Sequence, residues 1–442
     1  MNLTNIANLL GVPCNSKETV TGFCIDSRQI KPGNIFVAIQ GEHFDGHDFM
    51  AEAVSKGAIA IICSKPDKGV LIPQFEVPDP LKALAKTATA HRQTIHCPII
   101  ALTGSNGKTS VKEMIASILP KPAHATPGNL NNHIGAPLSV LQLTTSHRYA
   151  VFELGANHVG EIAYTAAIVQ PQVALINNIA PAHIGEFGSI EGVARAKGEI
   201  YQALPAGGVA VINEDDSYAH FWDSSLTDKK VLRFSLHKPV DVYAKTIQFN
   251  EQGCARFDLV LPTDQGQVTL QVPGEHAIAN ALAAASCSYA VGISLPHIIE
   301  GLEHFRGVAG RMTFLQGKNQ SLVIDDTYNA NLRSVLTAVS VLAKRRGRRI
   351  LVLGDMGELG SWTQAHHEEV GYAAQRQGID LLMTCGIHSA HSSKAFGDSA
   401  KHYSSQEELA QDLLNKLDAD TTVLVKGSRS AAMEKIVHRL VG

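Results

Sequence analysis

The sequence is poor in several features that mark special classes of protein. Its 442 residues include only seven cysteines, an odd number scattered along the chain without a Cys-x-x-Cys pair, which argues against a disulfide framework or a zinc ribbon. The 38 lysines and arginines against 41 aspartates and glutamates give a net charge of −3. The chain therefore lacks the positive field of a nucleic-acid or membrane-surface binder, and we expect no nucleic-acid partner.

Long apolar runs are also missing. No uninterrupted apolar stretch approaches the ~18 residues that a membrane-spanning helix needs. The first residues lack the basic start and the apolar run of a signal peptide. We therefore expect a cytoplasmic protein without membrane insertion, and we expect it to be a monomer.

The composition that remains is that of an ordinary globular chain, with 45% apolar and 18% charged residues. At roughly 100–200 residues per domain, the length suggests two to four domains. The pattern changes twice along the chain, so we predict an α/β protein of three domains, at residues 1–80, 81–310 and 311–442.

The first segment predicts a small α/β domain. Apolar runs at 34–39 and 58–63 lie on either side of a helix-like stretch at 49–56, which is the order of one βαβ unit. Pro78-Asp79-Pro80 then interrupts the chain, because a residue before proline is pushed out of helical geometry.

The second segment predicts a parallel sheet with an antiparallel extension. A helix at 81–91 is followed by apolar strands at 99–103, 149–154, 173–178 and 209–213, with helical stretches between them. Strands that alternate with helices favour a parallel sheet covered on both faces. After Lys229 the pattern changes to short alternating strands at 231–235, 254–261 and 267–272, followed by an alanine-rich helix at 277–290.

The third segment predicts a Rossmann-like domain. Its strands, at 321–325, 349–353, 380–384 and 422–425, are again separated by connections long enough for helices. Such doubly wound sheets bind ligands at the carboxyl ends of their strands.

A phosphate-binding loop follows the strand at 99–103. The loop reads Gly104-Ser105-Asn106-Gly107-Lys108-Thr109-Ser110 and leads into a helix at 111–119. Backbone N–H groups of such a loop surround phosphate, Lys108 can reach the terminal phosphates, and the Thr109 hydroxyl can bind Mg²⁺. The longer, eight-residue form of this motif has glycine where the chain has Leu102. The shorter loop points away from GTPases and generic ATPases and toward a particular subset of phosphate-loop proteins.

Two further residues are candidate Mg²⁺ ligands. Glu153 ends the strand at 149–154, so its carboxylate should emerge at the same sheet edge as the phosphate loop. Its alternative role is that of a solvated acid at a strand end. His183 follows the strand at 173–178 at the same edge, although a lone histidine is more often structural than a ligand.

Lys197 lies on the apolar stripe of the helix expected at 189–204. Burial is costly for an ammonium unless it is paired or loses its proton. A neutral amine could capture CO₂ as a carbamate and so become an oxygen ligand for Mg²⁺. The pattern leaves open the alternative that Lys197 reaches solvent or pairs with Glu199 or Glu161.

Together these residues resemble the Mur ligase family, the ATP-dependent amide-bond-forming enzymes of peptidoglycan precursor synthesis. The resemblance covers essentially the whole chain. The stretches that carry it are Gly104–Thr109, residues 128–135 (Gly-Asn-Leu-Asn-Asn-His-Ile-Gly), 153–157 (Glu-Leu-Gly-Ala-Asn), 182–185 (Ala-His-Ile-Gly), 326–331 (Asp-Thr-Tyr-Asn-Ala-Asn) and 354–360 (Gly-Asp-Met-Gly-Glu-Leu-Gly). The chain looks most like the members that add D-alanyl-D-alanine to UDP-N-acetylmuramoyl-tripeptide, and it lacks the Asp-Asn-Pro-Arg motif of the members that add meso-diaminopimelate.

The resemblance implies a role for each matching residue. Thr109 and Glu153 would hold the nucleotide Mg²⁺, and His183 with a carbamylated Lys197 would hold a second Mg²⁺ ion. Asn280 would contact the adenine of ATP, while Arg311 and Asp326 would contact its ribose and phosphates. The family usually has proline where this chain has Leu332, which puts the local turn in question.

Two substrate-binding regions follow from the same comparison. The first domain, with Ser27 and Arg28, would bind the uridine diphosphate end of the substrate, and Asn132 belongs to a family motif that we assign to substrate binding. The turn-forming residues around Ser27 are equally typical of ordinary turns. Lys426, Ser428 and Arg429 precede a helix expected at 431–440 and could bind a carboxylate or an acyl phosphate, or they could simply be solvated residues beside a capped helix.

The chain has twenty histidines, but their spacing does not predict zinc. His366 and His367 are adjacent, so the two rings cannot face one metal from a helix, and we interpret them as surface residues. Two rival functions are a folylpolyglutamate-type synthase and a P-loop ATPase switch without amide chemistry. The sequence leaves open whether the third residue of the tripeptide is lysine or meso-diaminopimelate.

Overall fold

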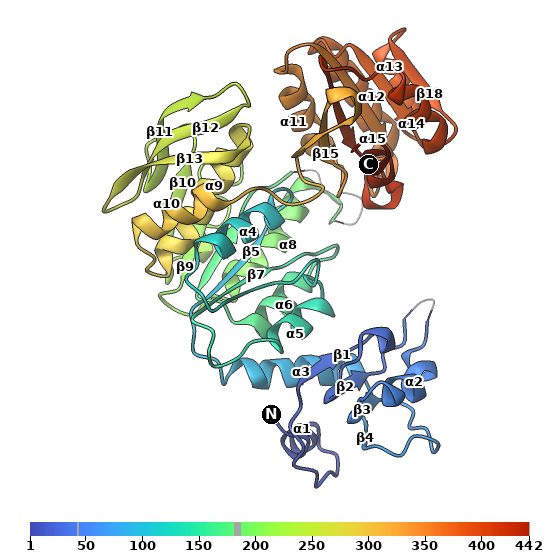
Figure 1. Cartoon of the computed structure of the whole chain (residues 1–442). Helices are drawn as coiled ribbons and strands as arrows, with labels where there is room; N and C mark the ends of the chain where they lie inside the picture. Colours follow the sequence, from blue (N-terminus) through green and yellow to red (C-terminus); the bar gives the residue numbers. More distant parts are fainter. Residues whose placement is uncertain (42–43, 181–186, 442) are drawn as a thin grey trace.

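A computed structural model describes residues 1–41, 44–180 and 187–441, and within them the chain forms three β-sheets with helices packed on them (Figure 1). The strand orders are β1-β2-β3-β4, β13-β12-β11-β10-β9-β8-β5-β7-β6 and β14-β15-β19-β16-β17-β18. The sheets follow one another along the sequence, from blue through green and yellow to red. The α/β fold in three parts is therefore confirmed.

The first sheet is parallel throughout, with strands β1 (Gly22–Cys24), β2 (Asn34–Val37), β3 (Ala60–Cys63) and β4 (Gln74–Glu76). Helix α2 (Met50–Ser55) connects β2 to β3, which confirms the predicted βαβ unit. Ile35 packs toward α1 (Leu3–Leu10), whereas Phe36 packs with Met50 on the opposite face. Strands β2 and β3 are buried along their whole length because both faces of this sheet are covered.

Helix α3 (Pro80–Arg92) joins the first sheet to the second. It begins with proline at its first turn, and the Asp79 carboxylate accepts hydrogen bonds from the N–H groups of Leu81 and Lys82. Leu84 belongs to the core of the first sheet and Ala88 to that of the second. One helix thus contributes to two cores.

The second sheet is parallel from β6 to β11 and antiparallel beyond. The predicted antiparallel extension is confirmed for β12 and β13, whereas β10, which the sequence pattern places in it, is parallel to both of its neighbours. Its strands are β5 (Ile99–Thr103), β6 (Ala123–Ala125), β7 (Tyr149–Glu153), β8 (Val173–Ile176), β9 (Val209–Asn213), β10 (Lys230–Ser235), β11 (Val242–Phe249), β12 (Cys254–Val260) and β13 (Gln265–Pro273). Its helices are α4 (Lys108–Ile118), α5 (Gly135–Val140), α6 (Glu161–Val169), α8 (Ile190–Gln202), α9 (Glu275–Ala290) and α10 (Leu295–His304). Strand β5 lies in the middle of this sheet, between β8 and β7.

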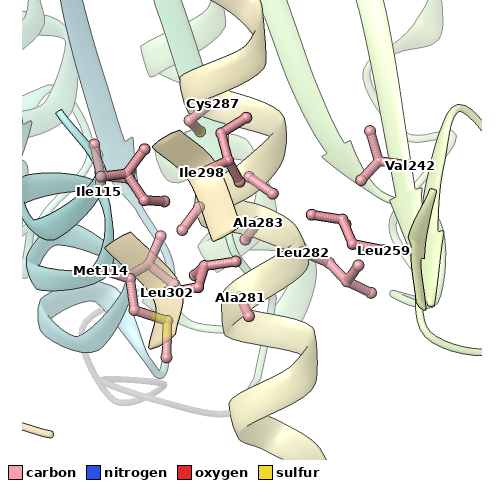
Figure 2. Close-up of a cluster of buried hydrophobic side chains, with 14 of the residues drawn as sticks. Met114, Ile115, Val242, Leu259, Ala281, Leu282, Ala283, Cys287, Ile298 and Leu302 are labelled. Atoms are coloured by element: carbon pink, nitrogen blue, oxygen red, sulfur yellow. The ribbon is translucent and has the colours of Figure 1, made fainter. Parts of the chain in front are cut away.

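The alanine-rich helix α9 is buried between the other helices and the strands (Figure 2). Ala283 and its neighbours let α4 approach, so that Met114 and Ile115 pack against one side of the helix. Val242 and Leu259 pack against the other side from the extension. The β10–β13 extension is therefore held on the same core as the phosphate-loop helix.

The third sheet has strands β14 (Thr313–Gln316), β15 (Leu322–Asp326), β16 (Arg348–Gly354), β17 (Leu381–Cys385), β18 (Ala400–Tyr403) and β19 (Thr421–Lys426). Helices α11 (Leu332–Ala343) and α12 (Thr363–Arg376) cover one face, while α14 (Gln406–Leu414) and α15 (Glu434–Val441) cover the other. Strand β14 is antiparallel at the edge and the remaining strands are parallel. Helix α13 (Ala390–Phe396) completes the set.

Two sequence interpretations in this part are wrong. The helix expected at 431–440 starts at Glu434, because Ala432 has a left-handed backbone (φ 48°) and ends a 3₁₀ turn at Arg429–Ala431. His366 and His367 are buried rather than on the surface. Nε2 of His367 accepts a hydrogen bond of 3.0 Å from the N–H of Met356, which ties α12 to the loop after β16.

Among the helices of the described ranges, none has the length and apolarity needed to cross a bilayer.

Candidate active site

A cleft of about 540 Å³ lies where the carboxyl ends of strands β5, β7 and β8 face those of β15 and β19. From the second sheet it is lined by the phosphate loop, Glu153, Lys197 and Asn280. From the third part of the chain it is lined by Arg311, Asp326 and Lys426. The cleft thus collects residues that lie more than 300 positions apart in the sequence.

The phosphate loop is held rigidly at this edge. Gly107 has φ +77°, and a Cβ at this position would lie 2.6 Å from Nδ2 of Asn177 and 2.7 Å from Oδ1 of Asn280, so only glycine fits. Asn178 accepts a 2.9 Å hydrogen bond from the N–H of Asn106 through Oδ1, and Nδ2 of Asn177 donates to the carbonyl of Asn106 at 2.9 Å. The loop is therefore shaped before any ligand binds.

Lys108 and Thr109 open helix α4 at the floor of the cleft. Nζ of Lys108 donates to the Gly104 carbonyl at 2.7 Å. Burial lowers the pKa of Lys108, while the carboxylate of Glu153 acts in the opposite direction and Arg311 adds to the lowering. An anionic phosphate would offset this burial, since an opposite charge favours the ammonium form.

Thr109 and Glu153 meet as the sequence analysis expects. Residue Leu102 of β5 is paired with Glu153 in the parallel register of β7, which brings the carboxylate beside the start of α4. Oγ1 of Thr109 donates to Oε2 of Glu153 at 2.9 Å, and Nδ2 of Asn131 donates to Oε1 at 2.9 Å. The result is a hydroxyl and a carboxylate side by side, the oxygen donors that Mg²⁺ prefers.

This donor set suits a cation that is coordinated mainly by phosphate and water. No group of three or more histidine, cysteine, aspartate or glutamate side chains is placed to hold a metal within the described ranges. Mg²⁺ in nucleotide sites needs only one or two protein ligands beside the phosphates. Thr109 and Glu153 meet that requirement.

Lys197 lies on α8 and lines the same cleft with 2% of its surface exposed. Burial, and secondarily the charge of Lys108, lower the pKa of Lys197 to about 7. Glu199 and Glu161, the two carboxylates that could have paired with Lys197, bind backbone groups instead. Glu199 accepts hydrogen bonds from the N–H groups of Gly160 and Ala163 at the start of α6, and Glu161 accepts one from the N–H of Asn157. The other residue predicted for this position, His183, lies outside the described residues.

Arg311 connects the third part of the chain to the phosphate loop. Its Nη2 donates to Oγ1 of Thr109 at 2.9 Å, and its guanidinium stacks on the ring of Tyr328 with 4.0 Å to the centroid. Nε of Arg311 and Nδ2 of Asn106 are buried without a hydrogen-bond partner among the described residues. Unpaired donors that line a cleft fit a ligand rich in oxygen acceptors, such as a polyphosphate.

Asp326 and Lys426 end the paired strands β15 and β19. Nζ of Lys426 binds Oδ2 of Asp326 at 2.6 Å and the carbonyl of Asn329 at 2.8 Å, and only 2% of Lys426 is exposed. Although Lys426 lines the cleft, its ammonium is used in this ion pair. Asn280 is 9% exposed, and its Oδ1 accepts a hydrogen bond of 3.1 Å from Nδ2 of Asn177 beside the phosphate loop.

The remaining residues predicted for substrate binding are more dispersed. Asn132 lines the cleft, and its Oδ1 accepts the N–H of Gly135 at 2.8 Å. Ser27 and Arg28 lie in the first sheet domain, outside the cleft lining, where Ser27 donates to Glu52 at 2.7 Å. Ser428 and Arg429 follow β19 and also lie outside that lining.

Arg429 forms an ion pair of 3.1 Å with Glu434, the first residue of α15. Ser428 and Ser430 share a hydrogen bond of 3.1 Å between their hydroxyls. The two residues therefore do not flank the amides of a helix start directly, since four residues separate Arg429 from Glu434 and Arg429 itself begins a 3₁₀ turn.

The turn at Leu332 is intact. Asn331 caps α11 in an extended conformation (φ −136°, ψ 165°) and forms a reciprocal capping box with Ser334. Leu332 is therefore the first helical residue, the position at which proline is favoured because no intrahelical bond needs its N–H. Leucine in place of the family's proline leaves the helix start unchanged.

Several residues of the site escape the motif analysis. Lys112, buried on α4, donates to the carbonyl of Thr126 at 2.9 Å, and the Thr126 hydroxyl accepts the N–H of Glu153 at 3.0 Å. This pair fixes the segment that carries the Glu153 carboxylate. Asn177 and Asn178 hold the loop itself, and an Asn-Asn pair directly after a strand of the same sheet is the pattern that would have revealed them.

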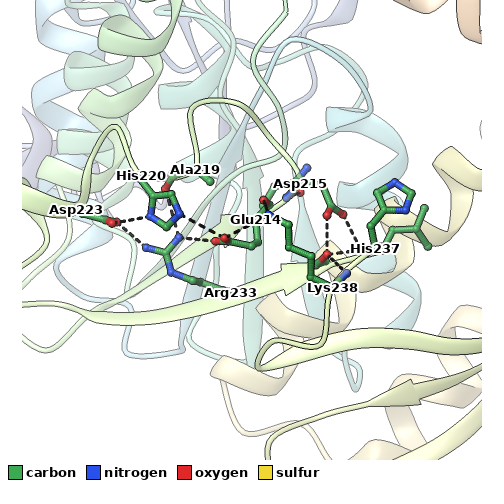
Figure 3. Close-up of polar contacts among 11 residues, drawn as sticks. Glu214, Asp215, Ala219, His220, Asp223, Arg233, His237 and Lys238 are labelled. Carbon is green, nitrogen blue, oxygen red and sulfur yellow. Dashed lines mark hydrogen bonds and ion pairs between the residues drawn. The ribbon is translucent and has the colours of Figure 1, made fainter.

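A polar network continues from the site along the ends of β9 and β10 (Figure 3). Arg233 binds Glu214 at 2.8 Å and Asp223 at 2.6 Å, and His220 lies against both carboxylates. Asp215 accepts the hydroxyl of Ser235 at 2.6 Å. These pairs fix the loop that follows β9. Asn213, the last residue of β9, donates a hydrogen bond from Nδ2 to the carbonyl of Asn177 at 2.9 Å.

Family models match all three parts of the chain. They are described as the Mur ligase family catalytic domain (residues 19–92), the Mur ligase middle domain (residues 102–288) and the Mur ligase glutamate ligase domain (residues 310–429). This chain belongs to the Mur ligase family. The prediction from the phosphate loop, Glu153 and the Asp326 motif is thereby confirmed.

Relatives and solved structures match over the full length of this Mur ligase. The UDP-N-acetylmuramoyl-tripeptide–D-alanyl-D-alanine ligase of Escherichia coli is 44% identical over 99% of this chain and 97% of its own, and that of Haemophilus influenzae is 42% identical over 94% and 92%. A crystal structure of MurF from Acinetobacter baumannii has a TM-score of 0.92 at 36% identity, covering 100% of this chain and 98% of its own.

Two more solved structures bear on the nucleotide and on the rival function. MurF of Thermotoga maritima, solved in complex with ADP, has a TM-score of 0.84 at 26% identity, covering 96% of this chain and 98% of its own. A folylpolyglutamate synthase of Mycobacterium tuberculosis has a TM-score of 0.65 at 16% identity, covering 81% and 94%. The second likeness is one of fold alone.

Proposed function

We propose that this Mur ligase joins D-alanyl-D-alanine to UDP-N-acetylmuramoyl-tripeptide at the expense of ATP. The observation that carries this proposal is the 44% identity to the Escherichia coli ligase of that name, over nearly the whole of both chains. The products are the UDP-N-acetylmuramoyl-pentapeptide precursor of peptidoglycan, ADP and phosphate. The cleft between the second and third sheets is where we place the reaction.

The reaction needs two steps. The terminal carboxylate of the tripeptide attacks the γ-phosphorus of ATP, which forms an acyl phosphate and releases ADP. The amine of D-alanyl-D-alanine then attacks the acyl carbon, so that an amide bond forms, phosphate leaves and the amine loses a proton. The phosphate-loop N–H groups and Lys108 stabilise the charge on the transferring phosphoryl group.

The contacts of the cleft support assignments for the nucleotide. Gly104, Ser105, Asn106, Gly107, Lys108, Thr109 and Ser110 would surround the phosphates. Asn280 would contact adenine, and Arg311 with Asp326 would contact ribose and phosphates. Thr109 and Glu153 would hold Mg²⁺, which supplies positive charge that neutralises the β- and γ-phosphates.

The second Mg²⁺ position is a proposal about Lys197. Its burial and its place beside the phosphate loop suit a carbamylated side chain, which would turn a costly buried cation into an anionic oxygen donor. The modification forms one N–C bond to CO₂ and releases one proton. By resemblance His183 would be the other protein ligand.

The division into domains at 1–80, 81–310 and 311–442 remains a prediction. We assign the UDP end of the substrate to the first domain, with Ser27 and Arg28, and the peptide region to Asn132 in the cleft. Ser428 and Arg429 remain candidates for the amine substrate, and Lys426 would act with Asp326. A cytoplasmic location and a monomeric state also remain predictions.

The decisive experiment measures phosphate release with ATP, Mg²⁺ and UDP-N-acetylmuramoyl-tripeptide, in the presence and absence of D-alanyl-D-alanine. The ligase releases phosphate only with the dipeptide and forms one pentapeptide per phosphate. A P-loop ATPase switch would release phosphate at the same rate without it. Parallel assays with tripeptides that end in lysine or meso-diaminopimelate identify the third residue.

A further inference from the structure

The segment Ile179-Ala180, which follows β8, is bound from two neighbouring elements of the second sheet. The N–H of Ile179 donates to Oδ2 of Asp216 at 2.8 Å, beyond β9. The N–H of Ala180 donates to Oγ of Ser105, in the phosphate loop, at 2.9 Å. The carbonyl of Ile179 takes its hydrogen bond from the third part of the chain.

Arg333 supplies that remaining contact from the first turn of α11. Its Nη1 donates to the carbonyl of Ile179 at 3.0 Å. Two residues earlier, Nδ2 of Asn331 donates to Oδ1 of Asn106 in the phosphate loop at 2.8 Å. One helical turn of the third part of the chain thus bonds to the phosphate loop and to the segment that flanks it.

We propose that Arg333 is a positioning residue that holds the third domain closed over the nucleotide site. The inference rests on the proposed function, because closure matters to an enzyme that must keep water from an acyl phosphate. Arg333 lines the cleft, but the hydrogen bond that its guanidinium makes is to the backbone carbonyl of Ile179. It acts through Ile179 and the phosphate loop.

The geometry favours a reversible contact over a structural one. Arg333 is an exposed residue of helix α11, and its hydrogen bond to Ile179, which follows β8, joins residues 154 positions apart in the second and third parts of the chain. The Asn331–Ser334 capping box keeps the turn itself ordered without that bond. When the third domain moves away, Arg333 returns to water at little cost, since the residue is already exposed in the closed arrangement.

The test compares the full-length chain with Arg333→Met and Arg333→Lys. Arg333→Met should lower kcat about fivefold, the factor expected for one hydrogen bond of ordinary net strength. It should also raise the ratio of phosphate released to pentapeptide formed above one, because water reaches the acyl phosphate more often. Arg333→Lys, which can still donate to Ile179, should restore part of both values.

Arg346→Met is the matched control. Arg346 also lies just after α11 and carries the same charge, but its side chain is exposed and forms no hydrogen bond or ion pair with the described residues of the second sheet. It should leave kcat and the ratio unchanged. The proposal would be overturned if Arg333→Met and the unmodified chain had the same kcat and the same ratio of phosphate released to pentapeptide formed.

A second readout separates this inference from the function on which it rests. The radius of gyration with Mg²⁺ and a non-hydrolysable ATP analogue, measured by small-angle X-ray scattering, needs no turnover. It should be larger for Arg333→Met than for the unmodified chain and for Arg346→Met. Equal radii would refute the role of Arg333 even if ligase activity is found, whereas absence of dipeptide-dependent turnover in the unmodified chain would refute the function alone.

Discussion

Asp326 and Lys426 face each other at the ends of two adjacent parallel strands, with 2.6 Å between Oδ2 and Nζ, although 100 residues separate them. Both are largely buried, at 9% and 2% exposure. The strand register places them directly opposite each other. A carboxylate proposed to contact ATP is thereby held by a lysine from the next strand, at the edge where the third sheet meets the phosphate loop.

Lys426→Met should destabilise the chain strongly. It leaves the Asp326 carboxylate buried without its cation, which typically costs about 3–5 kcal/mol in the free energy of unfolding. Urea unfolding followed by circular dichroism measures the loss. Lys401→Met is the control, because Lys401 is 59% exposed in its ion pair with Asp412 and should cost less than about 1 kcal/mol. A cost for Lys426→Met no greater than that of the control would contradict this account.

Lys197→Ala should abolish ligation. The change removes the amine that we propose as a carbamate, and short carboxylates such as formate or acetate should restore part of the activity by entering the space left behind. In the unmodified chain, incubation with ¹³C-labelled bicarbonate should give a carbamate resonance by NMR that is missing from the variant. Full activity of Lys197→Ala would remove the carbamate proposal.

Leu332→Pro should stabilise the chain. Asn331 already has the extended backbone that a residue before proline requires, and Leu332 occupies the first helical position. Proline there reduces the conformational entropy of the unfolded chain, by an amount worth about 0.4–1 kcal/mol. Ser340→Pro, in the interior of the same helix, should instead cost about 3 kcal/mol or more. A lower unfolding midpoint for Leu332→Pro would show that its N–H makes a bond the fold needs.

His124 should make stability depend on pH. Burial lowers the pKa of His124 to about 4, with smaller effects from the facing His147 and Lys112, and the ring binds Ser139 at 2.9 Å. Between pH 6.5 and 4 the unfolded chain binds this proton and the folded chain does not. The contribution of neutral His124 to the free energy of unfolding is therefore complete above about pH 6.5. It is lost as the pH falls toward 4, by up to about 3 kcal/mol. Urea unfolding at pH 7 and pH 5 should show a smaller difference in His124→Gln; an equal difference would contradict the assignment.

Local patterns were sufficient for much of the fold. Strands such as β5, β7 and β16 are apolar runs bounded by polar turns, and the phosphate loop has glycine where the backbone requires a positive φ. The patterns missed β1, β4, β6, β14 and β18, which lie at sheet edges, where few residues are buried on both faces. They also missed β11, which lies inside the second sheet but has only two buried residues among its eight. A strand of three or four half-exposed residues has too little periodicity to be distinguished from a loop.

Buried polar residues were the other source of error. His367 sits at the polar start of a helix, and adjacent histidines there are typical of a surface. Its burial depends on the loop after β16, whose Met356 donates to the ring. No pattern along α12 indicates that loop, because the contact is set by how the third sheet orders its strands.

The sequence by itself determined the kinds of element and the chemistry at their ends: a phosphate loop after β5, a carboxylate at the end of β7, and an acid and a lysine at the ends of two strands of the third sheet. Only the tertiary structure decided which of these groups meet. Thr109 reaches Glu153, Lys426 pairs with Asp326, and Arg333 binds Ile179. The reason is that strand order and register, which local sequence does not specify, bring residues more than 300 positions apart to one cleft.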